Sequence, residues 1–140
     1  MSAKDRFLVI EAAVQLLCAW LGLRVLSLPT LRRLLGGSPV PRGVGRRRLS
    51  IEGMRRVTWA VSATARRLPV NATCLVEALA AEAMLRRRGC ACDLRLGVLP
   101  PGRGLKPLTA HAWIEHEGVV MLGHVENLSD YALLSAPRGL

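Results

Sequence analysis

A cysteine and a histidine stand where a thiol could act as a nucleophile. Cys74 follows a threonine and opens the run 74–79 (CLVEAL), which has the pattern of a helix start. His111 opens the run 111–115 (HAWIE), which has the pattern of a strand. A helix N-terminus favours the thiolate, and an imidazole can take and return its proton. If the two side chains meet, they would form the centre of a cysteine-dependent acyl-transfer enzyme.

Each of these residues taken alone is more often structural. Cysteine is among the most buried residue types and commonly just packs. A lone histidine on a strand is more commonly a side chain with one satisfied hydrogen bond than a general base. Trp113 shares the predicted face of His111 and could shield the imidazole or belong to the core. Only the combination of the cysteine and the histidine points to catalysis.

The hydrophobic pattern predicts an α+β fold with the helices first. Apolar spacing, caps and the breakers Pro29, Pro69 and Gly89 predict helices over residues 4–26, 51–67 and 74–88, with a helical turn over 31–35. Asn71 or Thr73 would cap the third long helix. A Pro/Gly/Arg linker (residues 36–48) divides the chain into an N-terminal helical extension, residues 1–48, and a core, residues 49–140.

Alternating apolar residues predict three antiparallel strands after the helices. They cover residues 92–98 and the two arms of a hairpin, 109–115 and 119–125, with a loop at 100–104. A two-residue turn at Glu117-Gly118 would place His111 directly opposite His124. A three-residue turn would shift the pairing by one and bring Gly123 or Val125 there instead.

The third member of a catalytic triad, the group that orients His111, should therefore be His124 or its same-face neighbour Glu126. A carboxylate is the better orienter because it also stabilises the imidazolium that forms during attack. This favours Glu126 as the charged group and His124 as its neighbour. A dyad of Cys74 and His111 is the remaining alternative.

The chain is strongly basic, with 20 Lys and Arg against 10 Asp and Glu among 140 residues. A net charge of +10 suggests an acidic partner, such as an acidic peptide, an anionic membrane or a nucleic acid. The arginine clusters are spread over several elements, and no aromatic platform lies among them. We therefore expect no nucleic acid, although a nucleic-acid-binding protein remains the weakest of three functional hypotheses.

The four cysteines predict free thiols in a reducing, cytoplasmic setting. Cys90 and Cys92 are too close in sequence to bridge comfortably, and no secretory signal is evident. Their spacing is not that of a structural zinc site, and no His-Glu-x-x-His motif is present. We expect neither a metal nor a cofactor.

The apolar stretch 7–23 has nearly the composition of a transmembrane helix. Glu11 and Gln15 interrupt it and Arg24 closes it, so it falls short of the roughly 20 clean apolar residues that a span requires. A buried helix is the preferred interpretation. A helix that lies on a membrane surface, making the protein peripherally membrane-associated, is the alternative.

Four segments together resemble one known family. The runs 74–79 (CLVEAL), 85–89 (LRRRG), 94–98 (LRLGV) and 111–115 (HAWIE), with Gly118 closing the hairpin, look like those of the transglutaminase-like leader peptidases of lasso-peptide biosynthesis. The similarity is to the stand-alone peptidase half of the split B protein, and it covers about half of the chain. At the family's third position, where an acid is usual, this sequence has Gly123-His124, and the nearest acid is Glu126.

The resemblance implies a transglutaminase/papain-like fold with the cysteine helix packed on a small antiparallel sheet. It implies a cysteine peptidase that removes the leader from a ribosomally synthesised precursor peptide, with Cys74 as nucleophile and His111 as general base. The implied partners are the leader region of the precursor, a small leader-binding protein and an ATP-dependent macrolactam cyclase. The alternative is a non-catalytic binding module of the same fold that docks an acidic leader peptide or partner protein.

Overall fold

The computed structural model describes residues 2–36, 50–99, 109–125 and 128–134. Three sequence predictions therefore fall outside the description. The predicted linker 36–48 is described only at Gly36, and the predicted loop 100–104 and Glu126 are not described.

Four helices form the larger part of the fold. They are α1 (Ala3–Val25), α2 (Leu28–Gly36), α3 (Ile51–Arg67) and α4 (Cys74–Arg87). Side-chain caps fix three of their starts: Ser2 for α1, Ser50 for α3 and Thr73 for α4. The predicted helices are confirmed, and the cap of α4 is Thr73 rather than Asn71. Pro29 lies in the first turn of α2, where a proline is tolerated because its missing N–H would have no partner.

The strands form one antiparallel sheet in the order β3-β2-β1-β4. They are β1 (Asp93–Leu99), β2 (Thr109–His116), β3 (Val119–Leu122) and β4 (Ala132–Leu133), with a short 3₁₀ helix at Leu128–Asp130 before β4. The α+β prediction is confirmed, but the prediction of three strands is wrong. The two residues of β4 pair with Gly97 and Val98, and so short a strand leaves no alternation in the sequence.

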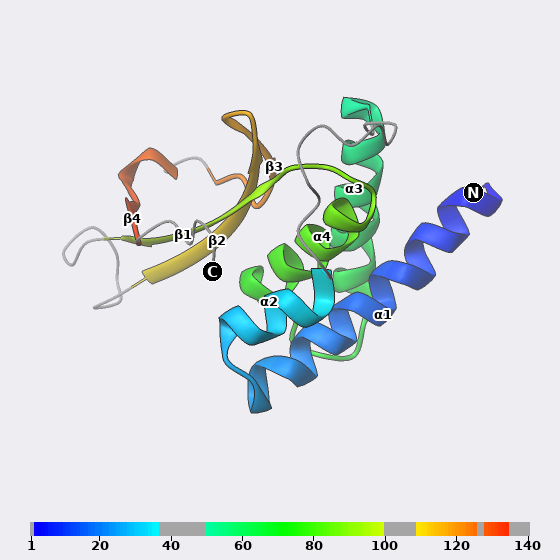
Figure 1. Cartoon of the computed structure of the whole chain (residues 1–140), viewed down its shortest axis with the longest axis horizontal. Helices are drawn as coiled ribbons and strands as arrows, with labels where there is room; N and C mark the ends of the chain where they lie inside the picture. The colour runs from blue at the N-terminus through cyan, green and yellow to red at the C-terminus, as the bar shows by residue number, and fades with distance from the viewer. Residues whose placement is uncertain (1, 37–49, 100–108, 126–127, 135–140) are drawn as a thin grey trace.

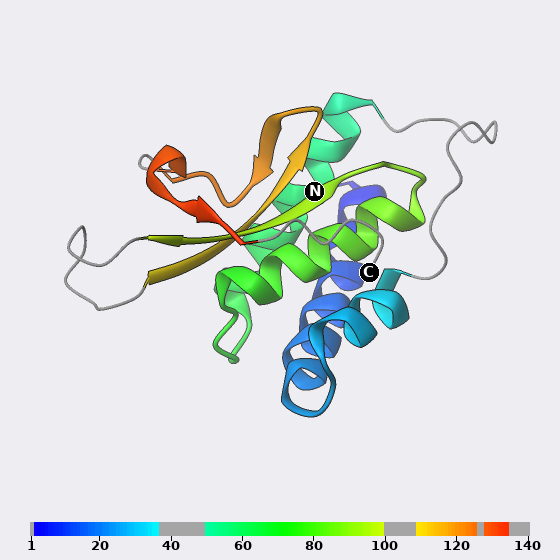
Figure 2. The same cartoon turned by 60° about the vertical axis from the view of Figure 1, so that its left-hand side comes forward.

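Helix α4 is the centre of the molecule. It packs against β2 on one side and against α1, α2 and α3 on the others, so the sheet and the other helices lie around it (Figures 1 and 2). Nine of its residues are buried, from Val76 almost continuously to Leu85. Helix α4 has neighbours on several sides, and its small alanines allow them to approach.

Ion pairs fasten the outer helices to α4. Arg32 of α2 forms two hydrogen bonds with Glu82, Nε to Oε1 at 2.9 Å and Nη2 to Oε2 at 2.6 Å. Arg88, at the end of α4, forms a similar pair with Glu11 of α1 at 3.0 and 2.5 Å. Because the carboxylates are satisfied, they can lie within a mostly apolar interface.

The β2–β3 hairpin begins as predicted and then departs from the prediction. Glu117 and Gly118 form the turn with positive φ angles of 50° and 80°, and the first residues on either side pair directly. A bulge follows, because Glu115 pairs with Val120 but Ile114 pairs with Leu122. The second arm then ends at residue 122 instead of residue 125. The predicted pairing of residue 111 with residue 124 is therefore wrong.

Candidate active site

Cys74 is the first residue of α4 and is half-buried. The side-chain oxygen of Thr73 accepts a hydrogen bond from the Val76 N–H at 3.4 Å, and the Thr73 carbonyl accepts the Glu77 N–H at 3.0 Å. Among the described residues, the N–H groups of Cys74 and Leu75 have no hydrogen-bond acceptor. N–H groups in the first turn of a helix have no intrahelical acceptor, so an oxyanion could bind at this helix start.

His111 is held by the backbone of the chain segment after β3. Its Nε2 lies 2.6 Å from the carbonyl oxygen of Gly123. A carbonyl can only accept a hydrogen bond, so Nε2 carries the proton and donates it. In the neutral ring Nδ1 is then unprotonated and able to act as a base. The ring also stacks on Trp113 at a centroid distance of 5.9 Å and lies 5.8 Å from the ring of Tyr131.

The backbone at Gly123 requires a glycine. Its φ angle is 88°, in the region that side chains rarely adopt. A Cβ there would lie 2.9 Å from the Ala112 carbonyl oxygen and 3.0 Å from Cβ of Trp113. The missing side chain lets the carbonyl approach β2 closely enough to bond His111. The sequence placed position 123 near His111 only in the alternative register, and it gave no sign that a carbonyl would be the partner.

Cys74 and His111 come from neighbouring elements. Helix α4 packs against β2, and in both views the end of α4 that follows residues 68–73 lies beside this strand (Figures 1 and 2). No hydrogen bond joins the two side chains in the described structure. His111 shares its face of β2 with Trp113, whereas Ala112 belongs to the core that α4 forms. The structure brings the two elements together and leaves the thiol and the ring separate.

Of the two residues expected to orient His111, only His124 is described, and no hydrogen bond joins it to His111. His124 is exposed, because the bulge and the early end of β3 carry it away from the position opposite His111. Glu126 lies outside the described residues. The Gly123 carbonyl therefore fixes the tautomer of His111, a task that a neutral acceptor performs as well as a carboxylate does.

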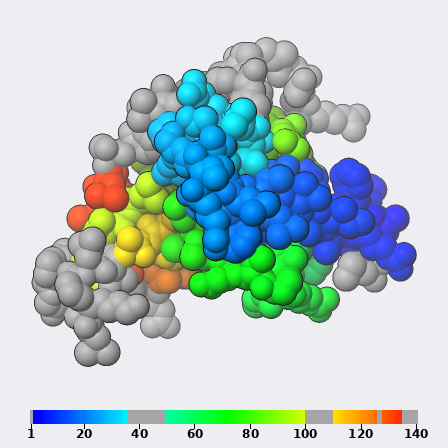
Figure 3. Space-filling view, turned by 90° about the horizontal axis from the view of Figure 1, so that it is seen from below, coloured from blue at the N-terminus to red at the C-terminus, as the bar shows by residue number. Residues whose placement is uncertain are grey.

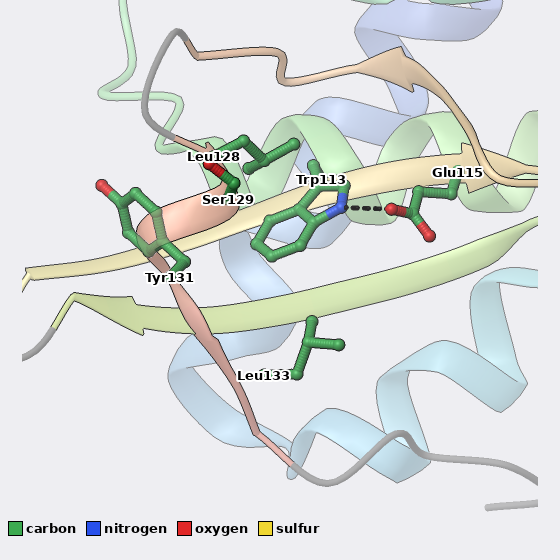
Figure 4. Close-up of a pocket in the computed structure, with 6 residues that line it drawn as sticks. All are labelled: Trp113, Glu115, Leu128, Ser129, Tyr131 and Leu133. Carbon is green, nitrogen blue, oxygen red and sulfur yellow. Dashed lines mark hydrogen bonds between the residues drawn. The ribbon is translucent and has the colours of Figure 1, made fainter.

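A shallow hollow of about 370 Å³ lies on this face of the sheet. It is lined by Trp113, Glu115, Leu128, Ser129, Tyr131 and Leu133. These side chains gather in front of the strands, with α4 behind (Figure 4). Glu115 accepts the Trp113 indole N–H at 3.1 Å and the Arg95 Nε–H at 3.1 Å, which fixes the indole. Because His111 contacts two of the aromatic rings, the hollow borders the imidazole.

The aromatic rings fit together because β1 has a glycine beneath them. A Cβ on Gly97 would lie 2.9 Å from atoms of both Trp113 and Tyr131. Tyr131 comes from the segment between the 3₁₀ helix and β4. The sequence singled out neither residue as part of the site: Gly97 lies directly across from His111 in the β1–β2 pairing, and the short fourth strand brings Tyr131 to the ring.

Two ionisable groups near α4, Glu77 and Cys92, have raised pKa values. Burial raises the pKa of Glu77, one turn after Cys74 on α4, and the nearby Arg66 opposes this only in part. Burial also raises the pKa of the Cys92 thiol to about 12, with a further contribution from Glu82. Cys92 is therefore a poor nucleophile. Within the described ranges, no group of three His, Cys, Asp or Glu side chains could hold a metal ion.

A family model described as the transglutaminase-like superfamily matches residues 13–136. This match covers well over half of the chain, so the chain belongs to the transglutaminase-like superfamily. Its fold fits that assignment, with the cysteine-bearing helix packed on a small antiparallel sheet and further helices before it. Neither the curated proteins nor the solved structures contain a match.

Proposed function

We propose that the protein is a cysteine peptidase that removes the leader from a lasso-peptide precursor, with Cys74 as nucleophile and His111 as general base. The main support for a peptidase function is the position of Cys74 at the capped start of a central helix that packs on the strand of His111. Membership of the transglutaminase-like superfamily supports the same chemistry. The resemblance of the four segments in the sequence supports the substrate.

The proposed reaction uses the unprotonated Nδ1 atom of the His111 imidazole. Nδ1 of His111 takes the thiol proton, and the Cys74 sulfur attacks the carbonyl carbon of the leader–core amide. The free N–H groups at the helix start stabilise the oxyanion. The imidazolium then protonates the leaving amine, which leaves a thioester on Cys74. A water molecule that gives its proton to His111 hydrolyses the thioester and releases the leader.

This mechanism requires the thiol and the ring to approach each other when substrate binds. Because the ring shares the Trp113 face of β2 while Ala112 faces α4, this approach is a rearrangement of the two elements and more than the shortening of an existing hydrogen bond. The hollow beside His111 would receive an apolar side chain of the peptide next to the scissile bond. The hydrogen bond to Gly123 would keep Nε2 protonated throughout.

We further propose that other proteins supply the substrate and use the product. A small leader-binding protein would present the precursor, and an ATP-dependent macrolactam cyclase would act on the released core. The genes beside this one should then encode a short precursor, a leader-binding protein and a cyclase. Their absence would argue against the lasso-peptide substrate without excluding a peptidase.

The test is cleavage of that precursor, followed by mass spectrometry with and without the leader-binding protein. Cys74→Ala and His111→Ala should abolish cleavage while melting near the wild-type temperature. Cys18→Ala is the matched control, because Cys18 is exposed on α1 and should leave cleavage unchanged. Undiminished cleavage by Cys74→Ala would refute the proposal. The leader-binding protein should increase the rate strongly, and equal rates without it would refute delivery in trans.

The second candidate is a binding module that docks an acidic leader peptide without cutting it. The absence of a hydrogen bond between Cys74 and His111 in the described structure favours it, as does the net charge of +10. The same assay separates the two functions. A wild-type protein that binds the leader but never cuts the precursor would establish the module.

A further inference from the structure

Helix α1 has two faces of different character. Its buried residues Ala12, Gln15, Leu16, Ala19 and Gly22 lie on the face toward α2, α3 and α4. The opposite face carries large apolar side chains that remain exposed, from 37% at Leu17 to 81% at Val25. The expectation of a buried helix is thus correct for one face only.

The exposed apolar side chains form one continuous stripe. They are Phe7, Ile10, Val14, Leu17, Leu21 and Val25. Intervals of three and four residues place them on the same side of a helix, over a length of about 27 Å. In the space-filling view from below, α1 (blue) lies uncovered along this side, with α2 (cyan) next to it (Figure 3). The helix is also long and apolar enough, by length and composition alone, to cross a membrane.

The charges of α1 are arranged around this stripe. Its two acids are turned toward other helices, where Asp5 pairs with Arg56 and Glu11 pairs with Arg88. The exposed charges are cations at the two ends of the helix, Lys4 and Arg6 at the start and Arg24 in the last turn. The outer face therefore has an apolar stripe between cations and no exposed acid.

We propose that the outer face of α1 binds an anionic membrane surface, with the helix lying along it. An apolar stripe bordered by cations is the pattern of a helix that enters the interface of anionic lipids. The net charge of +10 adds attraction to such a surface. This inference rests on α1 alone and does not depend on the proposed peptidase activity.

The same observations disfavour two other occupants. A second copy of α1 would bring like charges together, since an antiparallel pair sets Arg24 against Lys4 and Arg6, and a parallel pair sets each end against itself. A helix that crossed the membrane would have to expose its inner face to lipid. That face carries the buried Gln15 and lies beside the ion pair of Glu11 with Arg88.

The test is co-sedimentation of the full-length protein with vesicles. The protein should bind vesicles of phosphatidylglycerol and phosphatidylcholine in equal parts, and bind pure phosphatidylcholine much less. Leu21→Glu should weaken binding by about tenfold or more, because a leucine loses its burial and a charge takes its place. Ile51→Glu is the matched control, since Ile51 is 60% exposed on α3, Leu21 is 56% exposed, and the change in charge is the same.

A second pair of variants tests the cations. Arg6→Gln with Arg24→Gln should weaken binding to the anionic vesicles more than Arg55→Gln with Arg67→Gln, which removes the same charge from α3. Equal binding by Leu21→Glu and Ile51→Glu, or no binding to anionic vesicles, would overturn the proposal. The proposal would also be overturned if the protein formed a dimer that Leu21→Glu dissociates. A lower rate of precursor cleavage by Leu21→Glu in the absence of vesicle binding would overturn it too. Circular dichroism melting verifies that each variant is folded.

Discussion

Replacing Arg32 with methionine tests whether α4 depends on its buried ion pair. The side chains of Arg32 and Glu82 are only 10% and 3% exposed, and two hydrogen bonds join them. Methionine retains most of the apolar stem, so the main loss is the charge partner of Glu82. A buried carboxylate without its partner costs roughly 3–5 kcal/mol of folding free energy. At about 4 °C for each kcal/mol in a domain of this size, the melting temperature should fall by roughly 12–20 °C.

The assay is thermal unfolding followed by circular dichroism at neutral pH. The double variant Arg32→Met with Glu82→Met should regain most of the loss, because two apolar side chains of similar size can replace a buried pair. Arg56→Met is the matched control. It breaks the ion pair with Asp5 at a site where the arginine is 52% exposed, and its effect should be much smaller. Equal effects of the two single variants would refute the reasoning.

Three further predictions concern the site. Gly123→Ala should lower precursor cleavage by more than tenfold and stability by about 1–3 kcal/mol, because the strained backbone no longer holds its carbonyl against His111; wild-type rates would contradict this. Burial raises the pKa of Glu77 in the folded protein above its usual 4.5. The stability that this carboxyl contributes is therefore fully present below pH 4.5 and is lost as the pH rises through the pKa of the folded state. The melting temperature of Glu77→Gln should therefore be higher than that of the wild type at neutral pH. The difference should shrink to nearly zero near pH 4 without changing sign. His124→Ala should change kcat only a few-fold. A large loss of kcat in Glu126→Gln alone would show instead that the Glu126 carboxylate orients His111.

Local signals made most of the helical part predictable. The apolar spacing and Pro69 predicted α3 with its observed bounds, and the start of α4 was predicted with Thr73 as one of two alternative caps. The two-residue turn at Glu117-Gly118 was also predictable, because Gly118 readily adopts the positive φ angle that such a turn requires. In each case a few neighbouring residues determine the conformation.

Tertiary contacts decided the features that the sequence could not provide. The bulge beside Glu115 shifts the strand register by one residue, and it moves His124 away from His111. The carbonyl that holds His111 belongs to a backbone group, which every residue has and no residue type reveals. The exposure of one face of α1 likewise depends on which neighbours cover it, since an apolar helix has the same sequence pattern when it is buried all round.

The central claim is that Cys74 is the nucleophile, and its carbamidomethylation tests it most directly. In a Cys18→Ala background, Cys74 should be labelled before the two remaining thiols, because Cys90 is buried and the raised pKa of Cys92, about 12, keeps that thiol protonated. The protein is treated with iodoacetamide for increasing times. Mass spectrometry then gives the labelled fraction of Cys74, and cleavage of the precursor gives the remaining activity. The account predicts that activity falls in proportion to the unlabelled fraction of Cys74; full activity with Cys74 completely labelled would contradict it.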